Sequence, residues 1–342
     1  QAERQPGSSF KPFVYLAALE QGFTPASILD DAPIVVDQGP GLPKWKPVNY
    51  SDRFYGPSTL RLGVEKSRNL MTVRLTQEIG MDAVIDEAER FGIANGMSHT
   101  LASALGSSEV TLLELTSAYA MLVNGGKRIE PKLIDRIQDQ YGRTVLAPQA
   151  MGCLDCQAIA WDGLPPAPVP DNRERIVDAR NAYQIVSILE GVVQRGTGVR
   201  AREVGKPLAG KTGTTNDSRD AWFVGFSPDL AVGVYVGYDQ PKSLGDRQTG
   251  SSVALPIWID FMTAALEDQP ATPFRTPPGL RHVRIDARTG KLPGPGTDLI
   301  ISEAFLPGTE PREVQRGTPV ANRRGDEPFL PSTAAPTTSG LY

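Results

Sequence analysis

A serine and a lysine near the start of the chain have the spacing of a nucleophile and its base. Ser8 and Lys11 lie three residues apart, directly after the turn signal Pro6-Gly7. Apolar residues of helical period begin at Phe10, so we expect Ser8 at the first turn of a helix with Lys11 on the same face. A serine hydroxyl is a poor nucleophile until a neighbouring base takes its proton. The pair therefore indicates a serine activated by lysine; a helix cap followed by a solvated lysine is the alternative interpretation.

Lysine acts as a base only when burial or a nearby positive charge lowers its pKa from about 10.4. The chain has two histidines, His99 and His282, and this scarcity argues against a Ser-His-Asp triad. Ser9 is the rival nucleophile, but the residue three positions after it is Pro12, which carries no base. We therefore predict that Ser8 is the nucleophile.

The composition of the 342 residues is that of a globular protein, and the net charge of −4 offers no basic surface for nucleic acid. No uninterrupted apolar run is long enough to span a bilayer. Because the chain opens on Gln1, shortly before Ser8, we expect it to be a fragment of a longer protein. The two cysteines, Cys153 and Cys156, lie in an Ala/Pro-rich loop, where a structural disulfide and two free thiols fit equally well.

Hydrophobic periodicity predicts a helical part followed by a sheet. After the first helix, helices are predicted at residues 57–66, 69–78 and 81–91, after the capping box of Thr111 and Glu114, after Asp178, and at 257–266. After the helix that follows Asp178 the helical period ends, and residues 207–215, 221–226 and 230–238 are predicted to form three successive strands, joined by short turns into an antiparallel meander. Residues 132–145 are expected to form a hairpin, and the aromatic segment 45–50 either packs or lines a substrate groove.

These elements predict an α/β (α+β) domain over residues 1–270. It consists of an antiparallel sheet flanked by helices, with a helical lobe inserted between Ser8 and Lys211, and a loop insertion at about 146–170. A small β module is expected at 281–311. The remaining residues, 312–342, are rich in Pro, Thr, Gly and Arg and are predicted to be disordered.

Two further motifs follow Ser8 and Lys11 in order: Ser67-Arg68-Asn69 between two helices, and Lys211-Thr212-Gly213 on a predicted strand. This set resembles the signature of the penicillin-binding serine acyltransferase family. The likeness is closest to the transpeptidase domain of the bifunctional class A penicillin-binding proteins and extends from about residue 4 to 311. Further segments that carry it are Arg4-Gln5-Pro6-Gly7, Thr59-Leu60-Arg61, Ala104-Leu105-Gly106, Gly196-Thr197-Gly198, Asp220-Ala221-Trp222-Phe223 and Pro256-Ile257-Trp258.

The resemblance implies a role for each catalytic residue. Ser8 would attack the carbonyl between the last two D-alanines of a peptidoglycan stem peptide. Lys11 would be the base, kept partly neutral by burial and by the positive charge of Lys211. Ser67 would relay a proton to the leaving amine, and Asn69 would hydrogen-bond Lys11 and the substrate amide; helix caps are the alternative for both.

The resemblance also implies the substrate-binding residues. Lys211 and the hydroxyls of Thr212 and Thr214 would receive the terminal carboxylate, although Thr212 could equally be a strand residue that faces the core. Gly213 would leave room for the substrate to pair along the strand edge. The backbone N–H groups of Ser8 and Thr214 would form the oxyanion hole.

For the whole protein, the family implies an upstream glycosyltransferase domain and a membrane anchor, neither of which lies in this chain. The domain would then lie on the extracytoplasmic (periplasmic) face of the bacterial inner membrane. Its partners would be stem peptides, as D-Ala-D-Ala donors and amine acceptors, together with β-lactam antibiotics and regulators of cell-wall synthesis. No metal or organic cofactor is required.

Four alternatives remain open from the sequence. The motifs do not distinguish a transpeptidase from a D,D-carboxypeptidase or from a β-lactam sensor. A β-lactamase of the class A type would need a Glu-x-x-x-Asn segment, which is absent between Asn69 and Lys211. Family members carry a helix and strands of the central sheet before the serine, so we also predict that these residues alone form an unstable, inactive fragment.

Overall fold

A computed structural model describes residues 2–312, apart from 38, 40, 42 and 147–170, and residues 1–311 form one compact unit. The predicted cysteine pair, most of the loop insertion and the C-terminal tail lie outside the described residues. The helices are α1 (Lys11–Glu20), α2 (Leu60–Glu65), α3 (Asn69–Ile79), α4 (Met81–Arg90), α5 (Leu112–Val123), α6 (Ala179–Arg195) and α7 (Leu255–Ala265). The paired strands are β1 (Glu3–Arg4) with β4 (Val110–Thr111), β2 (Ile28–Asp31) with β3 (Gly56–Thr59), β5 (Ile137–Gln138) with β6 (Thr144–Leu146), and β10 (Arg281–Asp286) with β11 (Ile300–Phe305).

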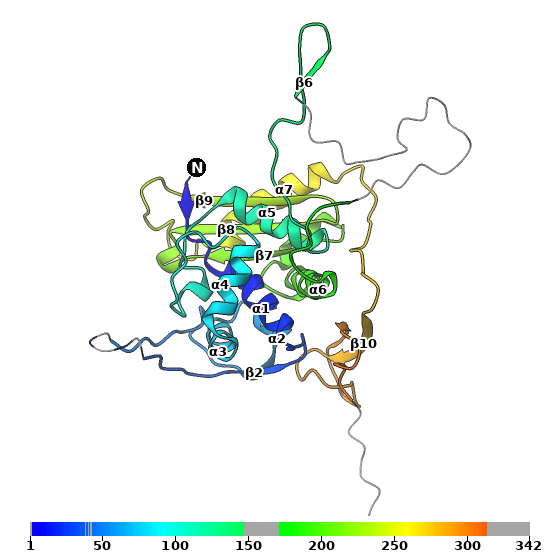
Figure 1. The fold of residues 1–342 in the computed structure, drawn as a ribbon. Coiled ribbons are helices and arrows are strands. Elements are labelled where there is room, and N and C mark those ends of the chain that lie inside the picture. The colour runs from blue at the N-terminus through cyan, green and yellow to red at the C-terminus, as the bar shows by residue number, and fades with distance from the viewer. Residues whose placement is uncertain (1, 38, 40, 42, 147–170, 313–342) are drawn as a thin grey trace, which may run out of the picture. The chain divides into compact units, whose positions relative to one another are not determined.

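The central sheet is the predicted antiparallel meander of β7 (Ala209–Thr214), β8 (Asp220–Phe226) and β9 (Ala231–Gly237). Alternate residues of β8 serve two hydrophobic cores. Trp222 and Phe226 belong to the core that contains α1, whereas Phe223 packs on Trp258 of α7 in the second core. Helices therefore cover both faces of the sheet, and the predicted fold class is confirmed (Figure 1).

Helix α1 is the centre of the larger core. Every residue from Lys11 to Leu19 is buried, and the polar groups among these side chains are the Lys11 amine and the Tyr15 hydroxyl, which lies 3.4 Å from the Thr72 hydroxyl. In Figure 1 it lies, in dark blue, between the sheet and the helices α2 and α3. The segment Gly7–Ser9 forms a 3₁₀ turn, η1, immediately before α1, which confirms the prediction that Ser8 stands at the mouth of a helix.

The helical lobe follows the predicted elements with one difference. The helix predicted at 57–66 begins only at Leu60, because Gly56–Thr59 pairs with β2 as strand β3. Thr59 then caps α2, since its hydroxyl accepts a hydrogen bond from the Leu62 backbone N–H at 3.3 Å. Gly80, with φ of 85°, separates α3 from α4 as expected, and the capping box of α5 is present.

The ribbon of β10 and β11 is fastened to the helices by a buried ion pair. Arg61 of α2 donates to Glu303 of β11 at 2.6 Å, and the two side chains are 3% and 0% exposed. The same guanidinium donates to the carbonyl of Ser187 on α6 at 2.9 Å and to Glu65 at 3.3 Å. Because α2 leads directly to the Ser67 connection, this network connects the ribbon to the candidate site.

Candidate functional site

Four predicted site residues, from three separate parts of the chain, meet in one hydrogen-bonded cluster. Ser67 and Asn69 stand at the start of α3, Lys11 at the start of α1, and Lys211 on β7. The Lys11 amine donates to the Ser67 carbonyl at 2.8 Å and to Asn69 Oδ1 at 2.7 Å. The Lys211 amine donates to the Ser67 hydroxyl at 2.8 Å. The Lys11 amine also lies 3.4 Å from the Ser67 hydroxyl, so Ser67, whose backbone is left-handed with φ of 55°, lies between the two lysines and contacts both.

Both lysines of the cluster are fully buried, and this burial controls their protonation. The pKa of Lys11 lies well below its ordinary value, first because of burial and second because of the positive charge of Lys211, while Asp31 acts in the opposite direction. Burial lowers the pKa of Lys211 to about 7. At neutral pH the site can therefore hold a neutral amine, which is the form that accepts a proton.

The two candidate nucleophiles have different surroundings. Ser9 is 0% exposed, and its hydroxyl donates to the Pro6 carbonyl at 2.7 Å. Ser8 is half-buried, and its hydroxyl makes no hydrogen bond to any residue that the structure describes. A reactive hydroxyl must reach both substrate and base, so the geometry favours Ser8 over Ser9.

The end of strand β7 lies directly against the turn that carries Ser8. A Cβ on Gly7, whose φ is 53°, would lie 2.7 Å from the Thr214 carbonyl oxygen. A Cβ on Gly213 would lie 2.3 Å from the Pro6 carbonyl oxygen. Gly213 is thus required by contact with the protein's own backbone, which is a different reason from the substrate pairing suggested by the sequence.

The hydroxyls of the two predicted threonines, Thr212 and Thr214, also make hydrogen bonds within the protein. The hydroxyls of Thr212 and Thr197 lie 2.8 Å apart, and the Thr214 hydroxyl accepts from the Gly250 backbone N–H at 3.0 Å. Thr212 is 7% exposed, whereas Thr214 is half-buried. Of the two, Thr214 is the more accessible, at the end of β7 next to η1.

Sequence reasoning missed a second layer behind the cluster. Asn49 accepts hydrogen bonds from the backbone N–H groups of Asn69 and Leu70, at 2.8 and 3.3 Å, and donates to Asp31 at 2.7 Å. Asn49 belongs to the aromatic segment 45–50, whose two proposed roles were packing and groove lining. No local signal identifies this role, because the partners that connect it to the site are 18 to 21 residues away in sequence.

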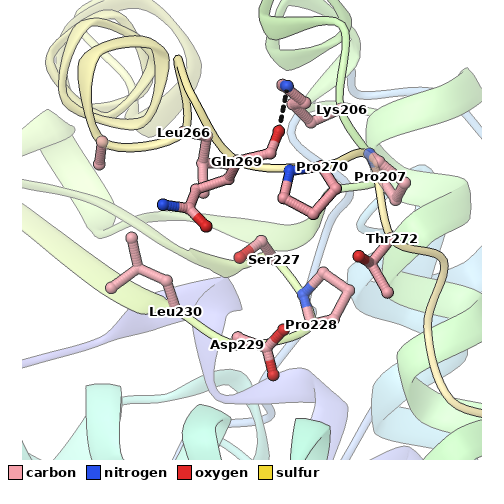
Figure 2. Close-up of a pocket in the computed structure, with 11 residues that line it drawn as sticks. Lys206, Pro207, Ser227, Pro228, Asp229, Leu230, Leu266, Gln269, Pro270 and Thr272 are labelled. Atoms are coloured by element: carbon pink, nitrogen blue, oxygen red, sulfur yellow. Dashed lines mark hydrogen bonds between the residues drawn. The ribbon is translucent and has the colours of Figure 1, made fainter.

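A separate pocket of about 280 Å³ lies at the turn between β8 and β9, beside the end of α7 (Figure 2). Its Lys206 amine donates to the Gln269 carbonyl at 2.5 Å, and none of the predicted site residues lines it. Within the described residues, no group of three His, Cys, Asp or Glu side chains could hold a metal ion. None of the helices over the same residues is long and apolar enough to cross a membrane.

Comparison with known proteins decides the family. The model of the penicillin-binding protein transpeptidase domain matches residues 1–263, and that of the C-terminal domain of penicillin-binding protein 1A matches residues 276–316. The chain belongs to the class A penicillin-binding proteins. The resemblance found in the sequence is thereby confirmed, while the domain limits at 270 and 281 stay predictions.

Relatives of this family extend well beyond the chain. Penicillin-binding protein 1A of Rickettsia conorii is 47% identical over 308 residues, which cover 89% of this chain and 38% of the relative. The crystal structure of penicillin-binding protein 1A from Haemophilus influenzae matches with a TM-score of 0.79 at 35% identity, over 91% of this chain and 49% of that chain. The chain therefore spans less than half the length of both.

A more distant structure shares the fold. PonA1 of Mycobacterium tuberculosis, solved in complex with penicillin V, matches with a TM-score of 0.65 over 80% of this chain and 72% of that chain. At 24% identity this likeness concerns the fold alone. The fold of this chain is thus shared with a protein at low sequence identity.

Proposed function

We propose that this chain is a peptidoglycan D,D-transpeptidase that forms cross-links through an acyl-enzyme at Ser8. One observation carries the proposal: the buried amine of Lys11, one turn from Ser8, is held by two close acceptors at 2.7 and 2.8 Å, with the Ser67 hydroxyl as a third, longer contact at 3.4 Å. A neutral lysine amine has two N–H bonds and one lone pair. If its N–H bonds are directed to the two closer acceptors, the Ser67 carbonyl and Asn69 Oδ1, the lone pair is available to take the proton of Ser8, directly or through the Ser67 hydroxyl.

In acylation, one proton leaves Ser8 and one proton is returned to the leaving nitrogen of the substrate. The Ser8 oxygen bonds to the carbonyl carbon of the penultimate D-alanine as its proton passes to Lys11. The Lys11–Ser67–Lys211 cluster returns a proton to the nitrogen of the terminal D-alanine, whose bond to that carbon breaks. The backbone N–H groups of Ser8 and Thr214 would stabilise the oxyanion, each donor contributing about 3–4 kcal/mol.

Transfer of the acyl group reverses these steps. The side-chain amine of a second stem peptide attacks the ester carbonyl, the Ser8 oxygen leaves and regains its proton, and a peptide bond forms between the stems. With water in place of the amine, the same site would act as a D,D-carboxypeptidase. A β-lactam follows the acylation step but keeps its leaving nitrogen tethered, so the adduct would persist.

The proposed substrate contacts lie along the end of β7. The charged form of Lys211 attracts the terminal carboxylate of the donor, and Thr214, three residues further along β7, carries the more accessible of the two threonine hydroxyls. Thr212 is less accessible, so its proposed contribution is to fix the strand through the Thr197 hydroxyl. Gly213 would permit the close approach of β7 to η1 that brings Thr214 beside Ser8.

Replacing Lys211 with alanine is expected to raise the KM for a stem peptide by about 10- to 100-fold, the equivalent of a hydrogen bond to a charged group at about 1.5–3 kcal/mol. Because its pKa is about 7, the charged fraction falls at higher pH, and the wild-type KM should rise above pH 7. The Lys211→Ala variant should lack that rise. Lys206→Ala, in the separate pocket, is the matched control in steady-state kinetics. An unchanged KM in Lys211→Ala would reject the carboxylate role.

Further proposals concern the protein that contains this chain. We propose that it acts on the periplasmic side of the inner membrane, anchored by an upstream segment, and that it also carries a glycosyltransferase domain. Stem peptides and β-lactams are its proposed partners. The support is membership of the class A family and the extent of the relatives beyond this chain.

The proposal is tested by intact mass spectrometry of the protein after penicillin treatment. The mass should increase by one penicillin and remain increased over hours, and digestion should place the adduct on Ser8. Loss of the adduct within minutes would indicate a β-lactamase. No adduct at Ser8 at any time would reject the enzymatic proposal.

A further inference from the structure

We infer that Asn49 and Asp31 are positioning residues of this site, which set the geometry of Ser67 and Asn69 from outside the three sequence motifs. The inference rests on the proposed function. Asn49 and Asp31 are 4% and 0% exposed, so neither can be a surface contact for a partner. Both act through other residues and make no hydrogen bond to Ser8 or Lys11.

Asn49 caps helix α3 from a distant loop. The residue at the N-cap position of α3 is Arg68, which provides no side-chain cap. The Asn49 Oδ1 atom takes over this role by accepting from the N–H groups of Asn69 and Leu70. The Asn69 side chain accepts a hydrogen bond from the Lys11 amine. The cap therefore fixes the start of α3 at the residue that holds this amine.

The opposite end of the Asn49 amide is fixed as well. Its Nδ2 atom donates to Asp31 Oδ1 at 2.7 Å and to the Arg53 carbonyl at 2.9 Å. These two acceptors determine which way the amide points, so Oδ1 faces α3. A carboxylate acceptor makes the bond charge-assisted and stronger than a bond between neutral groups.

Asp31 holds the other side of the motif through Arg68. Its Oδ2 atom pairs with Arg68 Nη1 at 3.2 Å, and the same nitrogen donates to Ser58 Oγ at 3.0 Å. The Arg68 guanidinium also lies over the Tyr55 ring, 4.0 Å from its centre. One buried carboxylate therefore restrains the two residues that follow the left-handed Ser67: Arg68 directly, and Asn69 through Asn49.

Asp31 also contributes the negative charge of this region. The charged and titratable groups that interact with it are Lys11, Arg68 and Tyr15. Its charge opposes the lowering of the Lys11 pKa by burial and by Lys211. Removing that charge should therefore leave Lys11 neutral at a lower pH.

A purely structural role makes a different prediction. If Asp31 and Asn49 only stabilised the lobe, their loss would lower Tm and the rate of acylation without moving its pH dependence. A positioning role through charge and hydrogen bonds predicts that the acid limb of the rate profile also moves. The pH profile of acylation therefore separates the two.

The test measures the second-order rate constant for acylation by a fluorescent penicillin across pH, together with Tm, in the intact protein. Asn49→Ala and Asp31→Asn should each lower the rate by about 10- to 100-fold, as expected for a catalytic group moved by a fraction of an ångström to 1 Å. In Asp31→Asn the acid limb should also move to lower pH. The control is Asp30→Asn, the same change on the exposed face of the same strand, which should match the wild type.

An exchange variant tests the pair itself. Asp31→Asn combined with Asn49→Asp restores one carboxylate and one amide in the opposite order, and it should recover at least about tenfold of the lost rate and return the acid limb toward the wild-type position. If a single variant does not fold, the double variant is compared with the wild type alone. Single variants with wild-type rates, an unmoved acid limb in Asp31→Asn, or an exchange no better than the singles would overturn the inference. If the wild type itself forms no adduct at Ser8, the proposed function fails instead.

Discussion

Ser8→Ala should form no covalent adduct with penicillin and should lose transpeptidation by about 10⁴-fold or more, as expected when a serine nucleophile is removed. The physical reason is that the half-buried hydroxyl of Ser8 is uncommitted among the described residues and stands one turn from a buried amine. The loss is measured by labelled penicillin and by release of D-alanine from a stem peptide.

Ser9→Ala is the matched control for that result. The Ser9 hydroxyl donates to the Pro6 carbonyl inside the core, so its loss should lower stability by about 1 kcal/mol and leave acylation intact. If Ser8→Ala still acylates and a peptide map places the adduct on Ser9, the assignment of the nucleophile is wrong.

Lys11→Met should lower the acylation rate by about 10²- to 10⁴-fold, the usual contribution of a general base. Methionine has a similar length and is apolar, so it fits a fully buried position while removing the lone pair. The rate of the wild type should fall at acid pH as Lys11 gains its proton, and the variant should lose this dependence. Its pre-steady-state acylation is measured from acid to alkaline pH.

Two outcomes would contradict the role of Lys11. An acylation rate within tenfold of the wild type would assign the role of base to the pair of Ser67 and Lys211 instead, whose hydroxyl oxygen and amine nitrogen lie 2.8 Å apart. A low rate that keeps the wild-type acid limb would mean that Lys11 shapes the site without accepting the proton.

The predictions from sequence succeeded where the signal is local. The capping box of Thr111, the glycine that separates α3 from α4, and the strand at 221–226 are each specified by neighbouring residues, and all three appear in the structure. The order of the three motifs was sufficient to predict that Lys11, Ser67, Asn69 and Lys211 meet, because the resemblance supplied the fold that joins them.

The sequence failed where the partner is distant. The strand Gly56–Thr59 exists because β2 lies beside it, and its own residues read as the start of a helix. The pairing of β1 with β4 spans two residues, too few for a pattern. Asn49 has an ordinary loop sequence around it, and its cap on α3 depends on the tertiary fold.

The ion pair between Arg61 and Glu303 has a consequence for how this architecture could be shortened. A polypeptide that stopped before β10 would lose Glu303, the closer carboxylate of Arg61, and would leave the buried guanidinium with the longer contact to Glu65. Arginine cannot shed its proton, and breaking a buried ion pair costs up to about 3–5 kcal/mol. The ribbon of β10 and β11 thus stabilises helix α2. Removing this ribbon would therefore loosen the turn that carries Ser67, at the end of α2.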